Sequence, residues 1–182
     1  MKRILLTYTL AFILLPVYGG EGGSSPAEKK SLLIDYVDPF IGTTNFGTTN
    51  PGAICPNGMM SVVPFNVMGS SENKYDKDAR WWSTPYEHTN CFFTGYAHVN
   101  LSGVGCPELG SLLLMPTTGE LNVDYKEYGS KYKDEQASPG YYSNYLTKYN
   151  VKTEVSATPR TSIARFTFPK GCLLYTSPSP RD

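Results

Sequence analysis

Two adjoining stretches late in the sequence alternate apolar and polar residues with a period of two. In VKTEVSA (residues 151–157), every second residue from Val151 onward would face one side, while the lysine, glutamate and serine between them would face the other. After TPRT (residues 158–161), SIARFTFP (residues 162–169) alternates in the same way through its alanine and two phenylalanines. This period belongs to strands, and two strands joined by a short turn predict an antiparallel hairpin.

Short apolar runs bounded by glycine or proline predict further strands. They are GMMSVVP, CFFTGYAH and GSLLLMP, at residues 58–64, 91–98 and 110–116. A helical period is absent apart from a possible turn near residues 29–36, and no internal repeat is visible. The predicted fold class is therefore all-β, as an antiparallel β-sandwich.

Size and charge limit the classes of function that are open. A chain of 182 residues is long enough for one domain with a real core. Its 16 basic and 16 acidic residues balance and form no long runs, so we expect neither a nucleic-acid partner nor an anionic membrane partner. The 14 tyrosines suit β-strands and sugar-binding surfaces alike, so composition alone leaves both interpretations open.

The N-terminus has the layout of a secretory signal peptide. Met-Lys-Arg precedes the apolar ILLTYTLAFILL, and a small residue follows near Gly19. The apolar run is too short for a comfortable membrane span, so no stable membrane anchor is expected, with an uncleaved N-terminal anchor as the alternative. We predict a signal peptide at residues 1–19, a linker at residues 20–34, and export to the periplasm or the extracellular space.

Cysteines and the C-terminal residues give weaker signals. The spacings of Cys55, Cys91, Cys106 and Cys172 fit no zinc pattern, so buried free thiols are expected, with one disulfide as the alternative. Residues 170–182 end in a Ser/Pro run that closes no structure, and LLYTSPSPRD resembles the translation of a sequencing-library adaptor. We expect this tail to be non-native and the chain to be cut short; the alternative is a genuine flexible tail.

Several motifs together resemble one enzyme family. DYVDPFIGT begins at Asp35, NPGAICPNGMMSVVP at Asn50, GYAHVNLSGVGCPELGSLLLMP at Gly95, and ASPGYYSNYL at Ala137, followed by the hairpin TEVSATPRTSIARFTFP. In this order they resemble the N-terminal domain of glycoside hydrolase family 92, the exo-acting α-mannosidases. The resemblance covers residues 35–169, nearly all of the predicted mature chain.

The resemblance implies an exported enzyme of two domains, a β-sandwich followed by an (α/α)6 barrel. Such enzymes hydrolyse terminal α-linked mannose with inversion and need calcium. Their catalytic acid and base and most calcium ligands lie in the barrel, which this sequence lacks. The chain would then be an N-terminal fragment that packs on its own second domain and shares in binding a mannose-containing glycan. The alternatives are a stand-alone carbohydrate-binding module without catalysis, and a surface β-sandwich that binds protein.

The glycine-rich stretch from Gly95 to Gly110 supplies the predicted contacts with sugar. An inverting glycosidase holds one sugar ring between carboxyl groups roughly 6.5–9.5 Å apart, and glycine permits close backbone approach to that ring. With the resemblance, we expect Gly103, Gly105 and Cys106 to form a loop at the rim of the sandwich, with His98 and Ser102 nearby. The alternative is a tight bulged turn between strands.

Two tryptophans precede this stretch in DARWWSTPYEH. An indole face can stack on a sugar ring or fill a core, and of the two we favour Trp82 as a substrate contact. This segment departs from the family's usual sequence, so the linkage cleaved stays open. No catalytic residue is predicted. His88 is expected at the surface, and the acids Asp35, Asp38 and Glu108 are expected to be structural or solvated.

Overall fold

The computed structural model describes residues 32–44, 47–67, 70, 85–100 and 109–172. The chain divides into two compact units, Met1–Ser31 and Leu32–Asp182, and all the described residues belong to the second. The predicted signal peptide and most of the predicted tail lie outside the described residues. Among those described, no helix is long and apolar enough to cross a membrane.

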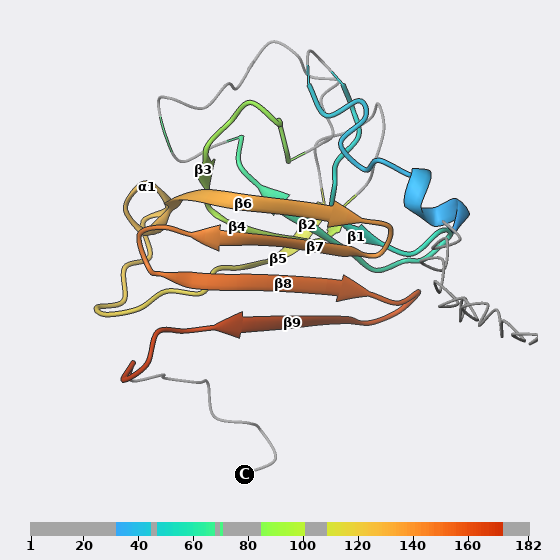
Figure 1. The fold of residues 1–182 in the computed structure, drawn as a ribbon. Coiled ribbons are helices and arrows are strands. Elements are labelled where there is room, and N and C mark those ends of the chain that lie inside the picture. The colour runs from blue at the N-terminus through green and yellow to red at the C-terminus, as the bar shows by residue number, and fades with distance from the viewer. Residues whose placement is uncertain (1–31, 45–46, 68–69, 71–84, 101–108, 173–182) are drawn as a thin grey trace, which may run out of the picture. The chain divides into compact units, whose positions relative to one another are not determined.

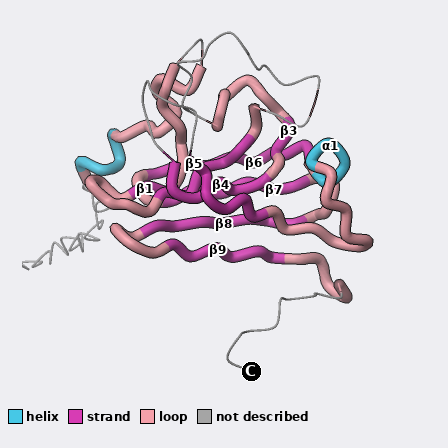
Figure 2. Tube along the Cα trace, turned by 180° about the vertical axis from the view of Figure 1, so that it is seen from behind, coloured by secondary structure: helices cyan, strands magenta, loops and turns pink. Residues whose placement is uncertain are grey.

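The described chain forms two antiparallel sheets (Figures 1 and 2). The four-stranded sheet has the order β1-β2-β4-β5, and the five-stranded sheet has the order β3-β6-β7-β8-β9. The first consists of β1 (Ala53–Ile54), β2 (Ser61–Phe65), β4 (Gly95–Asn100) and β5 (Leu109–Leu114). The second consists of β3 (Phe92–Phe93), β6 (Ser130–Ser138), β7 (Tyr141–Leu146), β8 (Val151–Ala157) and β9 (Ser162–Thr167). Helix is confined to the single turns η1 (Leu33–Tyr36) and α1 (Tyr125–Tyr128), so the all-β sandwich is confirmed.

The predicted hairpin is present as β8 and β9. The two strands pair from Lys152 with Thr167 to Ala157 with Ser162. The face predicted to be buried in β8 is confirmed by its valines and Thr153, but Glu154 on the opposite face is buried as well. The turn is tied to the four-stranded sheet, since the Pro159 carbonyl accepts hydrogen bonds from the backbone of the two residues that precede β2.

The prediction of one strand at residues 91–98 is wrong, because the chain changes sheets inside this run. Phe92 and Phe93 belong to the five-stranded sheet, whereas Gly95 begins β4 in the four-stranded sheet. Thr94 lies between them and donates hydrogen bonds to the carbonyl of Phe65 from its backbone and its hydroxyl, at 2.9 and 3.1 Å. Gly95 follows at φ +149°, where an added Cβ would lie 2.9 Å from Leu113. The switch therefore depends on a backbone conformation that an apolar pattern does not reveal.

Side chains from both sheets form one core. Its buried members include aliphatic residues and an unusual share of aromatic ones: Ala53, Val62, Phe93, Tyr96, Tyr142, Leu146, Tyr149, Val151 and Val155. The buried tyrosines keep their hydroxyl groups hydrogen-bonded; for example, Tyr149 donates to the carbonyl of Tyr128 at 2.6 Å. Packing of the two inner faces is the interaction that holds a sandwich together.

The expectation of buried thiols is wrong for the described cysteines. Cys91 is exposed, and Cys55 and Cys172 are only half-buried. Cys106 lies outside the described residues. Each described cysteine lies outside the strands, where the core does not cover it.

Candidate functional site

The glycine-rich stretch begins on β4, where His98 is the predicted site residue that the structure describes. Its side chain is buried, and its Nδ1 lies 3.2 Å from the carbonyl oxygen of Leu112 on β5. A carbonyl oxygen only accepts hydrogen bonds, so Nδ1 carries a hydrogen, and in the neutral ring Nε2 then keeps a lone pair. His98 can therefore offer an acceptor to a sugar hydroxyl, and its contact with substrate stays a prediction.

Beyond His98 the strand is distorted. Val99 has φ +58°, a region that a β-branched residue rarely adopts, and the pairing with β5 shifts register there. Asn100 is then held by Ser61, whose Oγ accepts from the Asn100 backbone N–H at 2.7 Å. The Asn100 Nδ2 group is buried and has no hydrogen-bond partner. Strain and an unpaired donor are thus concentrated where the glycine-rich segment leaves the sheet.

The other four predicted contacts, Trp82, Ser102, Gly105 and Cys106, lie outside the described residues. Their flanking residues are described. The glycine-rich segment leaves the sheet at Asn100, opposite the start of β2, while the tryptophan segment follows the end of β2. The length of β2 separates these exits by about 13 Å, at roughly 3.3 Å per residue. The tryptophan segment and the glycine-rich segment thus leave the described strands at different ends of β2, and the assignment of these four residues stays a prediction.

Glu135 is the centre of a buried polar network in the core. The register of β6 shifts between Lys133 and Gln136, with Asp134 at φ +53°, and this bulge turns the Glu135 side chain inward. Its Oε1 accepts hydrogen bonds from the hydroxyls of Tyr86 at 2.8 Å and Tyr142 at 2.6 Å. Burial raises the pKa of this carboxyl, although both hydroxyls partly oppose the rise.

His88 connects this network to the surface. Its side chain is 46% exposed, in agreement with the expectation of a surface histidine, and its Nδ1 lies 2.9 Å from the Tyr86 hydroxyl and 3.8 Å from Glu135 Oε2. Because Tyr86 donates its own hydrogen to Glu135, the His88 Nδ1–H must donate to the Tyr86 oxygen. Tyr86 can ionise only at very high pH, since burial and the nearby Glu135 raise its pKa.

Glu87 and Glu154 are also buried, and each carboxylate has its own hydrogen-bond donors. Glu87 Oε2 accepts from the backbone and the hydroxyl of Thr89, whereas Oε1 is buried without a partner. Glu154, on the outer face of β8, accepts from Arg165 and from Tyr141. Asp35 and Asp38 are exposed and accept backbone N–H bonds in η1 and the turn after it, in agreement with the expectation of structural or solvated acids.

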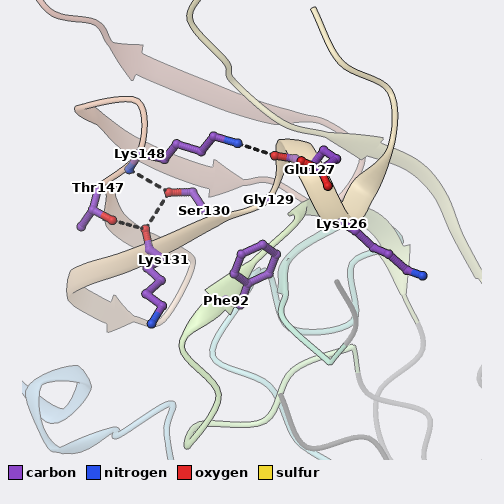
Figure 3. Close-up of a pocket in the computed structure, with 8 residues that line it drawn as sticks. All are labelled: Phe92, Lys126, Glu127, Gly129, Ser130, Lys131, Thr147 and Lys148. Carbon is purple, nitrogen blue, oxygen red and sulfur yellow. Dashed lines mark hydrogen bonds between the residues drawn. The ribbon is translucent and has the colours of Figure 1, made fainter. Parts of the chain in front are cut away.

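A surface cavity of about 400 Å³ lies beside α1 and the start of β6 (Figure 3). The hydroxyls of Ser130 and Thr147 both donate to the carbonyl of Lys131, and the Lys148 ammonium donates to the carbonyl of Glu127. Lysines predominate among its charged residues, and the carboxyl group of Glu127 is the single acid in the lining. This cavity therefore offers no pair of carboxyl groups for acid–base catalysis of glycoside hydrolysis. Its lining consists of Phe92, Lys126, Glu127, Gly129, Ser130, Lys131, Thr147 and Lys148.

Within the described ranges, no three His, Cys, Asp or Glu side chains lie close enough to hold a metal ion together. Calcium takes six to eight oxygen ligands, and the described ranges provide no cluster of three acidic side chains toward them.

Comparison with known proteins identifies the family. The model of the glycosyl hydrolase family 92 N-terminal domain matches residues 36–175. The chain belongs to this family.

Solved structures of family GH92 share the fold. An alpha-mannosidase from Bacteroides thetaiotaomicron is 33% identical, with a TM-score of 0.64, over 75% of this chain and 18% of its own. An inverting mannosidase from Bacteroides thetaiotaomicron VPI-5482 is 27% identical, with a TM-score of 0.55, over 76% of this chain and 18% of its own. The chain thus spans less than a fifth of the solved GH92 proteins it matches.

A relative known from its sequence is also described as a glycosidase. An uncharacterized secreted glycosidase of Arthroderma benhamiae is 29% identical over 155 residues, which are 79% of this chain and 18% of that protein. The GH92 N-terminal domain is thus part of larger glycoside hydrolases.

Sequence reasoning missed the network of Glu135, Tyr86 and His88. Glu135 lies 49 residues after Tyr86 in the sequence, and only the bulge in β6 turns Glu135 inward. It also missed Asn66, which is fully buried directly after β2. An asparagine that ends an apolar strand signals a turn, and nothing in the sequence distinguishes it from other turn residues.

Proposed function

We propose that this chain is the N-terminal β-sandwich domain of an exported, calcium-dependent exo-α-mannosidase that works with inversion. The observation that carries the proposal is the family match over residues 36–175, together with GH92 relatives described as mannosidases, one of them inverting. In the proposed enzyme the chain binds part of a mannose-containing glycan and packs on a second domain. That second domain provides the acid, the base and the calcium ligands.

Several exposed apolar side chains support the packing part of the proposal. Leu112 and Leu113 on β5 are 56% and 41% exposed, and Ile163 on β9 is 71% exposed. Large apolar side chains left on the surface can be covered by contact with another protein surface. For the chain itself, we propose a signal peptide at residues 1–19, a linker at 20–34, the domain at 35–169 and a non-native tail at 170–182.

Mannose release from an aryl α-mannoside tests the function. The enzyme of full family length should release mannose as the β-anomer, detected by proton NMR, and should lose activity in a calcium chelator. The 182-residue chain should release none, because it presents no carboxyl pair at the cavity described above. Turnover by this chain that survives repurification would contradict the division of labour, and mannoside binding without turnover by the full-length protein would favour a binding module.

The sequence-based site can be tested in the full-length enzyme. Gly105→Val should lower kcat/KM by an amount equivalent to about 1–3 kcal/mol, the cost of one strained backbone position, while the protein still folds. Glu108→Gln, three residues away, is the matched control and should change little. Full activity of the Gly105 variant would mean that the glycine-rich segment is only a turn.

A further inference from the structure

The surface cavity beside α1 collects lysines from three separate parts of the chain (Figure 3). Lys126 belongs to α1, Lys131 to β6, and Lys148 to the turn that follows β7. All three residues are exposed, and the single acid that shares the lining with them is Glu127. Within the described ranges, neither Lys126 nor Lys148 forms an ion pair with a carboxylate. The cavity therefore carries an excess of positive charge.

Hydrogen bonds fix the backbone that carries these lysines. The Thr147 backbone N–H donates to the carbonyl of Lys131 at 2.9 Å, and the Lys148 backbone N–H donates to Ser130 Oγ at 3.1 Å. The Lys148 ammonium donates to the carbonyl of Glu127, which joins the turn after β7 to α1. An ammonium group has three N–H donors, so Lys148 has two more to offer to a ligand. Because like charges that are held close together repel, a bound anion would be favourable here.

Phe92 adds an apolar surface to the cavity. It pairs with Lys131 across β3 and β6, so both side chains lie on the same face of the sheet. In the view of Figure 3, the half-buried ring of Phe92 lies between the side chains of Lys126 and Lys131. Gly129 makes room for this ring, because an added Cβ at Gly129 would overlap it. The cavity thus combines an aromatic ring with ammonium groups.

We propose that this cavity binds an acidic sugar, one that carries a sulfate or carboxylate group. The lysines contact the anionic group, and the ring of Phe92 packs against the apolar face of the sugar. The cavity volume of about 400 Å³ lies within the range of small-molecule sites, roughly 300–1,000 Å³. The negative charge of the ligand follows from the lysines alone, whereas the choice of a sugar rests on the proposed function.

Saturation-transfer NMR on the full-length enzyme tests the proposal, with titrations that give Kd for each probe. The probes are glucose 6-sulfate, glucuronate and glucose, which differ from mannose at C2 and so do not report on a mannose site. We expect at least one of the acidic sugars to bind about tenfold more tightly than glucose, and added salt to weaken its binding. The tighter of the two acidic sugars identifies the anionic group.

The double variant Lys126→Gln/Lys148→Gln removes two of the ammonium groups. Binding of the acidic sugar should weaken about tenfold, while binding of glucose should not change. Lys133→Gln is the matched control, because Lys133 is also an exposed lysine of β6 beside an aromatic ring, that of Tyr145, but is not part of the lining. If the double variant does not fold, Lys126→Gln alone should weaken the same binding about threefold.

Three results would overturn the proposal: equal binding of glucose and both acidic sugars, equal effects of the cavity and control variants, or inorganic sulfate and acetate that bind as tightly as the acidic sugars. The last result would mean that the cavity holds an anion and makes no use of the sugar ring. Phe92→Leu should weaken the acidic sugar more than inorganic sulfate. Hydrolysis of an aryl α-mannoside by the wild-type enzyme tests the proposed function separately, and the glucose-based probes decide the cavity whether or not that function holds.

Discussion

The two faces of the five-stranded sheet each hold a carboxylate, and they stabilise it by different means. On the inner face, Glu135 accepts from two tyrosine hydroxyls, and burial raises its pKa. On the outer face, Glu154 lies 2.7 Å from the Arg165 guanidinium and 3.2 Å from the Lys152 ammonium. The hydrogen bonds from Arg165 and Tyr141 hold the pKa of Glu154 below its usual range.

The difference shows what neutral donors and cations can do for a carboxylate. Hydroxyl groups orient Glu135 but do not fully replace the water it has lost, so its charged form is disfavoured. Cations at the surface favour the charged form of Glu154, but water and salt weaken that attraction. Loss of the inner network should therefore lower the free energy of unfolding more than loss of the outer ion pairs.

Removal of the Glu135 carboxylate should lower the free energy of unfolding more than any other change proposed for the two faces. Glu135→Ala leaves the hydroxyls of Tyr86 and Tyr142 without their acceptor and opens space in the core, which should cost about 2–4 kcal/mol. Urea unfolding followed by circular dichroism measures this. Glu135→Gln keeps an acceptor oxygen and should cost clearly less; equal losses in the two variants would mean that the hydroxyls do not depend on this carboxyl.

Removal of a single hydroxyl group from the inner face should lower the free energy of unfolding by less than removal of the Glu135 carboxylate. Tyr96→Phe removes the hydroxyl that lies 2.5 Å from Thr153 Oγ1, but Thr153 keeps its bond to Asn144. A loss of about 1 kcal/mol in the free energy of unfolding follows, because one buried partner is removed and no polar atom is left alone. Tyr141→Phe, on the outer face beside Glu154, is the control and should lose less in the same urea experiment.

The outer ion pairs should contribute least to the free energy of unfolding at neutral pH. Arg165→Ala removes the guanidinium beside Glu154, but the Arg165 side chain is 73% exposed, so we expect a loss of about 0.2–1 kcal/mol. Added salt should reduce the difference from wild type. A loss as large as that of Glu135→Ala would reverse the comparison between the two faces.

The pH dependence should have opposite signs at the two carboxylates. The folded state binds the Glu135 proton more tightly than the unfolded state, so stability is lost as pH rises from about 4.3 through the raised pKa. The folded state binds the Glu154 proton more weakly, so stability is lost as pH falls through the lowered pKa. Tm against pH for Glu135→Gln and Glu154→Gln should show these opposite differences from wild type.

The fold class and the hairpin could be predicted because alternation in β8 and β9 is local to the sequence. The change of sheet at Thr94 could not, since it depends on a hydrogen bond to Phe65 and on contact between Gly95 and Leu113. The strands β6 and β7 were not predicted either. The bulge at Asp134 interrupts the period of two in β6, and polar residues such as Asn144 are buried in β7.

For the site, the motifs that resemble the family indicated the glycine-rich stretch as a sugar contact. His98 is the one predicted contact whose surroundings the structure describes. Its bond to Leu112 depends on the pairing of β4 with β5, which the sequence did not reveal. The hydrogen-bonded cluster around Asn66 was beyond prediction for a similar reason. Asn66 and Asn90 are ordinary turn residues until β2 and β6 bring their partners to them.

The order of strands along the chain has a consequence for biosynthesis. The four-stranded sheet comes entirely from residues 53–114. The ribosome synthesises these residues before β6 to β9, which lie in residues 130–167. The apolar inner face of the first sheet is therefore exposed until the later strands have been synthesised. Chaperones bind nascent chains in such a state. We predict that nascent chains ending before Ser130 are digested readily by protease throughout residues 53–114, and that chains extended past Thr167 resist. Equal resistance of both would show that the first sheet folds without its cover.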